Sequence, residues 1–239
     1  MAIFALVLIT LFPFLILAVL SKNERIVYYA HFWPTNAARV MLFLFGVRLV
    51  IHNKELIDGD GQYIYISNHR SYLDAFVAGA AIPNFLKFLG KAEILNWPIM
   101  GYLMKHFYVP VWRKDKDHRS WSMSEMNKLI KTGCSFFICP EGTCNIGTDF
   151  FIRFYDGAFK LAIETGIPVV PLTFISTGEI MPRNNLLLLP GMVHVYWHEP
   201  IPASEISYEN IEVMKEKVQN IMREDLLKHY PQGKYQLQN

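Results

Sequence analysis

The sequence predicts an α/β fold: a mixed, mostly parallel sheet flanked by helices, with a hydrophobic N-terminal membrane-associated helical segment. From Tyr63 onward, short runs of β-branched and aromatic residues alternate with helical patterns, as in chains whose strands are connected through helices. The 239 residues are 52% hydrophobic, which is enough for one substantial core and high for a purely soluble protein. We therefore expect membrane-associated helices over residues 1–52 and one folded domain over residues 53–239.

The first twenty residues are apolar and carry no charge. As a helix they would cover about 30 Å, roughly the thickness of the hydrocarbon core of a bilayer. The positive n-region and the clear A-x-A cleavage site that mark a signal peptide are both missing. We therefore expect these residues to form a membrane segment that is not cleaved.

A second apolar stretch, residues 41–51, is too short to span a bilayer and follows an aromatic-rich link. One interpretation is an interfacial or re-entrant helix in which Arg48 extends toward the interface. An ordinary helix buried against the folded domain is an equally good interpretation on length. Basic residues flank the apolar segments and favour the cytoplasmic side for those flanks: Lys22, Arg25 and Arg39.

Five strands and five helices are expected in the folded domain. The expected strands are residues 63–67, 107–113, 135–140, 169–175 and 192–198. The expected helices are residues 72–81, 94–105, 121–131, 158–165 and 207–229. The last of these has Glu, Lys and Met at helical spacing, so we expect an amphipathic covering helix without a chemical role.

The composition argues against two classes of function. The formal net charge is +2, and the sequence has no basic run with interleaved aromatic residues of the kind that a nucleic-acid groove needs. Cys134, Cys139 and Cys144 are five residues apart, which matches neither a CxxC pair nor an even disulfide framework, and no standard zinc spacing is completed. We interpret them as reduced thiols and expect no metal, no cofactor and no nucleic-acid partner.

The strongest local feature is SNHRSYLDAF, residues 67–76, which follows an apolar strand and opens a helix. Ser71 as the N-cap and Asp74 three residues later match a capping-box arrangement, which leaves His69 in the preceding turn. Asp74 can then accept from one imidazole nitrogen of His69, while the other nitrogen acts as a general base. On one continuous helix the two side chains would point about 140° apart, so the turn is essential. The alternative is that Asp74 only caps the helix and His69 is a turn residue.

A second feature is FICPEGTCNIG, residues 137–147, where an apolar strand runs into Pro140, Glu141, Gly142 and Thr143. Glycine after a strand lets the backbone approach a ligand, and successive amides in such a turn can hold an anion or oxyanion. Glu141 is expected to hydrogen-bond an acceptor hydroxyl. Taken alone, the segment is better interpreted as an ordinary turn with a surface glutamate.

Four segments occur in a fixed order: NHRSYLD, then VPVWR ending at Arg113, then PEGT, then IPVVP. This ordered set resembles the glycerolipid acyltransferase family, which includes the bacterial 1-acylglycerol-3-phosphate acyltransferases. The resemblance implies that His69 deprotonates the acceptor hydroxyl and that Asp74 orients the imidazole. The hydroxyl would then attack the thioester carbonyl directly, with no covalent acyl-enzyme. The resemblance also implies a substrate-binding set, which we take to include Asn68, Arg113, Glu141, Gly142 and Thr143.

The chain departs from this family at the cations that hold the acceptor's phosphate. The motif PEGTR has Cys144 in place of Arg, and the Phe-Lys-Lys-Gly of typical members is Phe-Tyr-Asp-Gly at residues 154–157. Cysteine cannot replace a planar, permanently charged guanidinium, so the usual phosphate site should be weakened. Three cations are the candidates to compensate and complete the expected binding set: Arg153, Arg113 and Lys91.

The predicted function is therefore that of a membrane-bound O-acyltransferase in phospholipid biosynthesis, with its catalytic domain on the cytoplasmic face. The expected donor is acyl-CoA or acyl carrier protein, and the expected acceptor is a lysolipid in the bilayer, first of all 1-acylglycerol-3-phosphate. Two alternatives stay open besides a thioester hydrolase, which would release the thiol with water alone. One is a lyso-aminolipid acceptor with an amino-acid head, which the replacement of Arg by Cys144 favours, and the other is a non-catalytic membrane lipid-binding protein.

Overall fold

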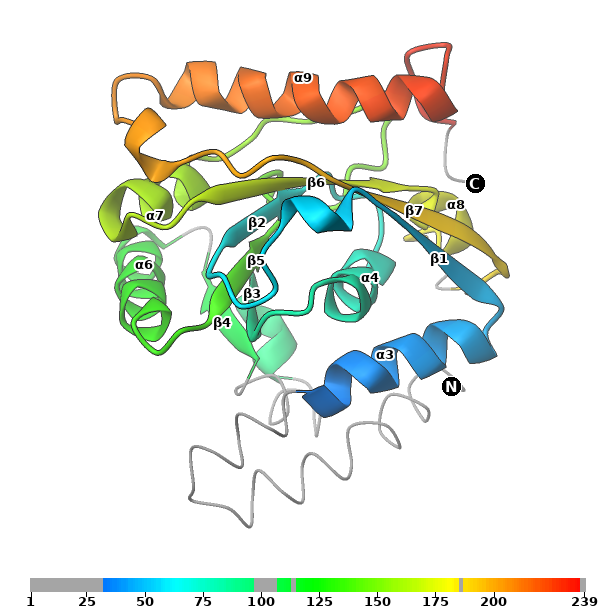
Figure 1. Cartoon of the computed structure of the whole chain (residues 1–239), viewed down its shortest axis with the longest axis horizontal. Helices are drawn as coiled ribbons and strands as arrows, with labels where there is room; N and C mark the ends of the chain where they lie inside the picture. The colour runs from blue at the N-terminus through cyan, green and yellow to red at the C-terminus, as the bar shows by residue number, and fades with distance from the viewer. Residues whose placement is uncertain (1–31, 97–106, 113–114, 185–186, 237–239) are drawn as a thin grey trace.

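A single sheet forms the centre of the molecule, with helices on both of its faces (Figure 1). The computed structural model describes residues 32–96, 107–112, 115–184 and 187–236. In this part of the chain the strands are β1 (Val47–His52), β2 (Ile64–Ser67), β3 (Leu86–Lys91), β4 (Tyr108–Val111), β5 (Ser135–Ile138), β6 (Val169–Ile175) and β7 (Gly191–Trp197).

The sheet has the strand order β1-β7-β6-β2-β5-β3-β4. Only β6 and β7 pair in antiparallel fashion, and all the other neighbouring strands are parallel. The predicted α/β class with a mixed, mostly parallel sheet is therefore confirmed. Because β2, β5 and β6 are parallel neighbours, the turns that follow them emerge at the same edge of the sheet.

Helices cover the sheet in two layers. They are α3 (Phe32–Leu44), α4 (Leu73–Ala81), α6 (Lys116–Ile130), α7 (Gly157–Thr165), α8 (Thr177–Ile180) and α9 (Ile211–His229), with short 3-10 turns at Lys54–Leu56, Ala92–Asn96 and Ala203–Glu205. In Figure 1, α9 lies along one face of the sheet, whereas α3 and α4 lie on the opposite side.

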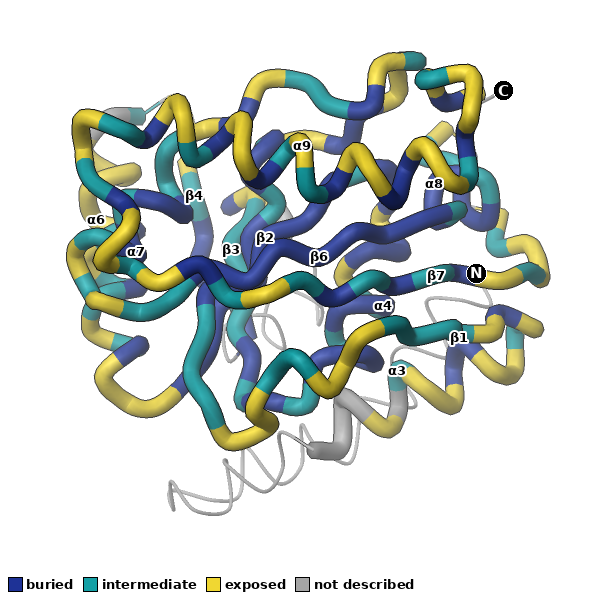
Figure 2. The backbone as a smooth tube through the Cα atoms, turned by 45° about the horizontal axis from the view of Figure 1, so that its top comes forward, coloured by how far each residue is buried: buried dark blue, intermediate teal, exposed yellow. Residues whose placement is uncertain are grey.

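The alternation of side chains along β2 explains why both faces are covered. Ile64 and Ile66 belong to the core cluster shared with α6, α7 and α9. Tyr65 points the other way, into the cluster shared with α3 and α4. All four residues of β2 and all seven of β6 are buried (Figure 2), as expected for central strands of a parallel sheet.

The helix expected over residues 41–51 is wrong in its second half. α3 ends at Leu44, and β1 then pairs with β7 in parallel at the edge of the sheet. Gly46 separates the two elements with φ +71, a left-handed conformation that ends helices readily. The segment VRLVIH that follows is rich in β-branched residues, which favour a strand.

Strand β3 was not among the expected strands. Its sequence, LKFLGK, has lysines and a glycine in place of a β-branched run. The glycine is required by packing, because a Cβ at Gly90 would lie 2.1 Å from the hydroxyl of Tyr108 on β4. Glycine in a strand often marks such a close approach.

Element boundaries account for most of the remaining differences. α6 begins at Lys116, not at residue 121, because the Asp115 carboxylate accepts from the backbone N–H groups of Asp117 at 2.9 Å and His118 at 3.1 Å. α9 begins at Ile211, four residues later than expected. Most of the helix expected over residues 94–105 lies outside the described residues, and only the 3-10 turn Ala92–Asn96 is seen there.

The N-terminal membrane segment expected over residues 1–20 lies outside the described part of the chain. Among the residues that the structure does describe, no helix has both the length and the apolar character needed to cross a bilayer. α3 packs against α4, and β1 belongs to the sheet, although both precede the expected domain border at residue 52. That border stays a prediction.

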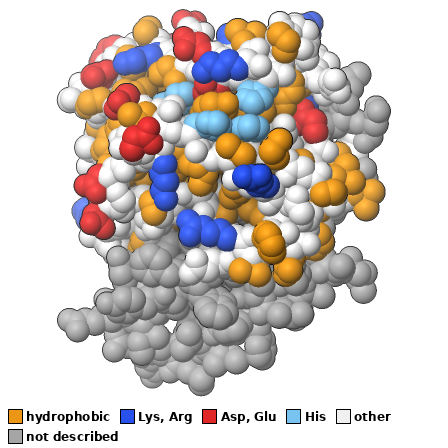
Figure 3. Space-filling view, turned by 45° about the vertical axis from the view of Figure 1, so that its right-hand side comes forward, with side chains coloured by type: hydrophobic (Ala, Val, Ile, Leu, Met, Phe, Trp, Pro, Cys, Tyr) orange, Lys and Arg blue, Asp and Glu red, His pale blue; other side chains and the backbone are white. Residues whose placement is uncertain are grey.

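A cluster of histidines ties the edge of the sheet to the end of α9 and can be seen on the face in Figure 3. His52 Nε2 lies 3.0 Å from His194 Nδ1, and the ring centroid of His194 lies 4.7 Å from that of His229. Burial, followed by the neighbouring histidines, lowers the pKa of His194. The neutral form of its ring is therefore favoured, which suits its place among other histidines.

Candidate active site

The His69 turn and the Glu141 turn meet at the carboxyl edge of the sheet. β2 ends at Ser67 and β5 at Ile138, and the two strands are parallel neighbours in the sheet. The backbone N–H of Asn145 donates to the carbonyl of His69 over 2.7 Å, which joins the two turns directly. The segments that carry the two sequence motifs are thus brought into contact.

His69 and Asp74 form a close pair. His69 Nδ1 lies 2.7 Å from Asp74 Oδ2, and the Asp74 side chain is 1% exposed while that of His69 is 21% exposed. Asp74 Oδ2 also accepts from the backbone N–H groups of Arg70 at 2.9 Å and Ser71 at 3.0 Å. Three donors on one oxygen hold it as an acceptor, so Nδ1 carries the ring proton and Nε2 is left as the basic nitrogen.

Ser71 lies in the turn before helix α4, and its hydroxyl does not contact His69. Its hydroxyl accepts from the backbone N–H of Leu73 at 3.1 Å and donates to the carbonyl of Met181 at 2.6 Å. The N-cap position of α4 is Tyr72 and not the expected Ser71, and no side chain caps the helix there. The Ser71 contacts, with the bond from its N–H to Asp74, hold the turn before α4 and place Asp74 where it can receive the imidazole.

Glu141 supports the His69 backbone. Its carboxylate is buried, with Oε1 accepting from the His69 N–H at 2.7 Å and Oε2 from the Ile152 N–H at 3.1 Å. Burial raises the pKa of Glu141 to about 7, although both amides act in the opposite direction. We expected this carboxylate to hydrogen-bond an acceptor hydroxyl, but both of its oxygens are committed to backbone amides. The structure therefore assigns Glu141 a positioning role.

Asn68, expected to bind substrate, holds the start of the His69 turn in the structure. Its side-chain amide is buried. Nδ2 donates to the carbonyl of Phe174, and Oδ1 accepts from the Phe174 N–H, both over 2.8 Å. Its Nδ2 also donates to the hydroxyl of Tyr235 over 3.1 Å. The amide thereby extends the β2–β6 pairing past the end of β2 and fixes where the His69 turn begins.

Arg70 is a functional residue that the motif analysis passed over. Its guanidinium is buried, donates to the carbonyl of Gly147 at 2.8 Å and to that of Asn145, and stacks 3.9 Å from the centre of the Tyr235 ring. Arg70 thus fastens the loop after Glu141 and the C-terminal segment to the His69 turn. Its place beside His69 in the sequence is the signal that could have indicated it.

Two thiols lie beside the imidazole. Cys144 Sγ is 3.3 Å from His69 Nε2 and 3.9 Å from Nδ1, and Cys139 Sγ is 3.8 Å from the hydroxyl of Ser67. Burial alone lowers the pKa of His69, but Cys139 and the hydrogen bond that the ring donates to Asp74 outweigh it, so that the pKa is raised well above 6.5. The base is therefore a strong one, and the Cys144 thiol lies against its ring.

The three cations that were expected to bind the acceptor differ in where they lie relative to His69. Lys91 ends β3, two strands from β2, and pairs with Glu93 at 3.3 Å. Arg153 is exposed and lies over the ring of Tyr155, which packs against Gly142. Gly142 has φ +70, which favours glycine at this turn. Arg113 lies outside the described residues.

Arg183 is a cation that the sequence analysis missed. Thr143 is exposed, and its hydroxyl lies 3.4 Å from Arg183 Nη1. The same nitrogen lies 3.5 Å from the carbonyl of Cys144. Arg183 follows the short helix α8, in a segment that has no motif of its own, so its sequence position carried no signal.

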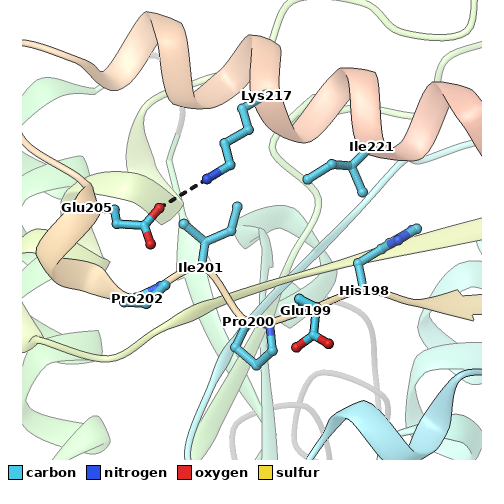
Figure 4. A pocket seen from close by; sticks show the side chains of 8 residues that line it. All are labelled: His198, Glu199, Pro200, Ile201, Pro202, Glu205, Lys217 and Ile221. Atoms are coloured by element: carbon cyan, nitrogen blue, oxygen red, sulfur yellow. Dashed lines mark hydrogen bonds and ion pairs between the residues drawn. The ribbon is translucent and has the colours of Figure 1, made fainter.

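One surface pocket of the described part of the chain lies away from His69. A pocket of about 410 Å³ between α9 and the segment after β7 is lined by residues that include Ile201, Glu205 and Lys217 (Figure 4). Ile201 pairs with Val169 at the start of β6, at the sheet edge opposite His69. We assign this pocket no part in the chemistry of His69.

The arrangement at His69 can perform general-base catalysis. A buried carboxylate orients the imidazole through Nδ1, which leaves Nε2 to accept a proton from a hydroxyl. The raised pKa of His69 increases its strength as a base. The site combines an oriented base with neighbouring apolar and cationic side chains, as a transfer reaction onto an alcohol needs.

Comparisons with known proteins agree with this chemistry. A family model described as acyltransferase matches residues 48–175. The chain is 31% identical over 204 residues to the chloroplastic 1-acyl-sn-glycerol-3-phosphate acyltransferase BAT2 of Brassica napus, a match that covers 83% of this chain and 56% of that protein. It is 35% identical over 158 residues to the chloroplastic enzyme LPAT1 of Arabidopsis thaliana, covering 64% and 43%. The chain thus spans about half the length of these two relatives.

A bacterial relative and a solved structure are similar over most of their length. The 1-acyl-sn-glycerol-3-phosphate acyltransferase of Escherichia coli is 25% identical over 210 residues, covering 83% of this chain and 84% of that enzyme. The crystal structure of the acyltransferase PlsC from Thermotoga maritima has the same fold, with a TM-score of 0.80, 21% identity, and coverage of 96% and 92%. Because the family model matches more than half of the chain and the Brassica relative exceeds 30% identity over most of it, the chain belongs to the acyltransferase family.

Proposed function

We propose that this chain is an O-acyltransferase that moves a fatty acyl group from a thioester, acyl-CoA or acyl carrier protein, to the free hydroxyl of a lysolipid. The preferred acceptor is 1-acylglycerol-3-phosphate. The observation that carries the proposal is the His69–Asp74 pair, with Nδ1 held by a buried carboxylate and Nε2 left as the base. The names of the Brassica and Escherichia coli relatives support the choice of acceptor.

In the proposed reaction, His69 Nε2 takes the proton of the acceptor hydroxyl as its oxygen attacks the thioester carbonyl. The tetrahedral intermediate collapses by breaking the carbon–sulfur bond, and the imidazolium returns the proton to the leaving thiolate. An ester and a free thiol result, and no acyl-enzyme forms. Asp74 stabilises the imidazolium that exists between the two proton transfers.

The acceptor must reach His69 past Cys144, whose thiol lies 3.3 Å from Nε2. A thiol is a weak donor and acceptor, so an acceptor hydroxyl replaces this contact at little cost. The lyso-aminolipid alternative has one observation in its favour, the cysteine in the position of the family's phosphate-binding arginine. Association with the cytoplasmic face of a membrane, through the N-terminal residues, is part of the same proposal.

The test is acyl transfer from radiolabelled acyl-CoA or acyl carrier protein to lysophosphatidic acid, in parallel with a lyso-aminolipid. We expect His69→Ala to remove product formation while folding and membrane binding are retained. His118→Ala is a matched control, because His118 also has its Nδ1 2.7 Å from an aspartate oxygen, but on the exposed start of α6. Near-normal activity of His69→Ala would refute the mechanism, and activity on the lyso-aminolipid alone would assign the other acceptor.

A further inference from the structure

A guanidinium lies at the point where the two site turns come together. Arg183 is partly buried, and its Nη1 lies 3.4 Å from Thr143 Oγ1 and 3.5 Å from the carbonyl oxygen of Cys144. Its Cζ lies 5.9 Å from the ring centre of Tyr72, which belongs to the His69 turn. Arg183 therefore contacts the Glu141 turn and faces the His69 turn at the same time.

The guanidinium and the base approach the same residue. The carbonyl oxygen of Cys144 faces Arg183, and its thiol faces His69 Nε2. In a lysolipid with a glycerol phosphate head, the free hydroxyl and the phosphate ester are on adjacent carbons. An acceptor whose hydroxyl replaces the thiol contact at His69 thus has its phosphate on the side where Arg183 lies.

The contacts of Arg183 at this turn are the kind that a phosphate displaces. Both use Nη1, and both are long for hydrogen bonds. A phosphate oxygen forms charge-assisted bonds of about 2.7–2.9 Å to a guanidinium, which are roughly twice as strong as bonds between neutral groups. A phosphate at this position would therefore take the guanidinium over from the Thr143 hydroxyl and the Cys144 carbonyl.

Other cations near the site are bound differently. Arg70 donates to the carbonyls of Asn145 and Gly147 and is buried. Lys91 pairs with Glu93 at the end of β3, with β5 between it and β2. Arg183 instead approaches the residue that stands in the position of the missing family arginine.

We propose that Arg183 is the cation that binds the phosphate of the acceptor in this chain, replacing from a different loop the arginine that Cys144 has displaced. The inference rests on the proposed acyl transfer and deepens it, because it makes the acceptor a lysolipid with a phosphate-bearing head. It names Arg183 as a specificity-determining residue of the reaction.

The experiment compares wild type, Arg183→Gln and Arg183→Lys with two acceptors of the same acyl chain, lysophosphatidic acid and the uncharged monoacylglycerol. Glutamine can still hydrogen-bond to Thr143 and Cys144, so it tests charge separately from support of the turn. We expect Arg183→Gln to raise the KM for lysophosphatidic acid about tenfold or more, because a bond to a charged group is lost. The KM for monoacylglycerol and the kcat should change by less than about twofold, and Arg183→Lys should be intermediate because lysine lacks the planar fork.

Arg48→Gln is the matched control, because Arg48 is an exposed arginine on the edge strand β1, three strands from β2. An equal change of KM for both acceptors in Arg183→Gln, or an equal loss of kcat with both acceptors, would overturn the inference and assign Arg183 to support of the turn. An active wild type with an unaffected Arg183→Gln variant refutes this inference alone. A wild type that acylates no lysolipid refutes the proposed function as well.

Discussion

The substitution Asp74→Asn separates the charge of the carboxylate from its geometry. Asp74 Oδ2 accepts from His69 Nδ1 and from the backbone N–H groups of Arg70 and Ser71. An asparagine must keep its oxygen in this place, because all three partners are donors. The imidazole therefore keeps its tautomer in the variant, in contrast to a triad in which the amide turns its NH₂ group toward the histidine.

The expected loss of activity follows from that geometry. A hydrogen bond to a charged group contributes about 1.5–3 kcal/mol, and one between neutral groups about 0.5–1.5 kcal/mol. The difference of about 1–2 kcal/mol corresponds to a decrease of roughly 5- to 30-fold in kcat/KM, since about 1.4 kcal/mol is a factor of ten. A change of tautomer would instead cost a factor of about 10⁴.

Folding stability should fall as well. Asp74 Oδ1 is buried and has no hydrogen-bond partner among the described residues. In the variant the amide nitrogen occupies that position with two donors that find no acceptor, at a cost of about 1–3 kcal/mol. Urea unfolding, measured with the activity, separates this loss from the catalytic one.

The pH profile provides an independent reading of the same change. The raised pKa of His69 means that the imidazole loses its proton only above pH 6.5. A plot of kcat/KM against pH should therefore have a rising limb above that value. Without the charge of Asp74, this limb should move to lower pH. An activity loss near 10⁴ with the limb unmoved would refute the reasoning, because it would show that the amide had inverted the tautomer.

Two further predictions concern the neighbours of the base. Cys144→Ala should retain most of the activity and resist a small thiol-modifying reagent that inactivates the wild type, because the reaction needs no acyl-cysteine; loss of turnover in the unmodified variant would argue for a covalent intermediate. Glu141→Gln should change how stability depends on pH. Its folded pKa of about 7 lies above the ordinary 4.5, so the ionised glutamate opposes folding as pH rises through 7. Relative to wild type, the variant should gain up to about 3 kcal/mol between pH 5 and pH 8 in urea unfolding, and an unchanged difference would contradict the burial of this carboxyl.

The parts of the site that the sequence predicted are those determined by local structure. A strand end followed by Ser-x-x-Asp specifies a helix start, and the structure contains the resulting turn, with His69 and Asp74 in contact. The helices and strands with clear periodicity were found within a few residues of their observed bounds. β3 was missed because its strand character depends on pairing with β5, which is far away in the sequence. β1 has β-branched residues of its own, but they continue an apolar run that begins in α3, so the whole run was interpreted as one helix.

The roles of the polar side chains could not be predicted, because burial decides them. Asn68 and Glu141 are residue types that often bind ligands, and both belong to motifs. Residues from other parts of the chain form their environments. The backbone of Phe174 hydrogen-bonds the amide of Asn68, and the backbone N–H of Ile152 donates to the carboxylate of Glu141. Arg183 reaches the site only through the loop after α8, so no spacing within the motif segments indicates it.

Different residues of the site orient the base and bind the acceptor, which explains how the motif turn can keep its structure without the family's arginine. Glu141 holds the backbone of His69, and Arg70 holds the loop that continues from Cys144. Neither contact depends on the side chain at position 144, so the base remains oriented whatever residue stands there. The binding cation, in contrast, needs only to reach the acceptor, which is the role that we propose for Arg183. The acceptor preference of this chain should therefore follow the residue at position 183, while its chemistry follows His69 and Asp74.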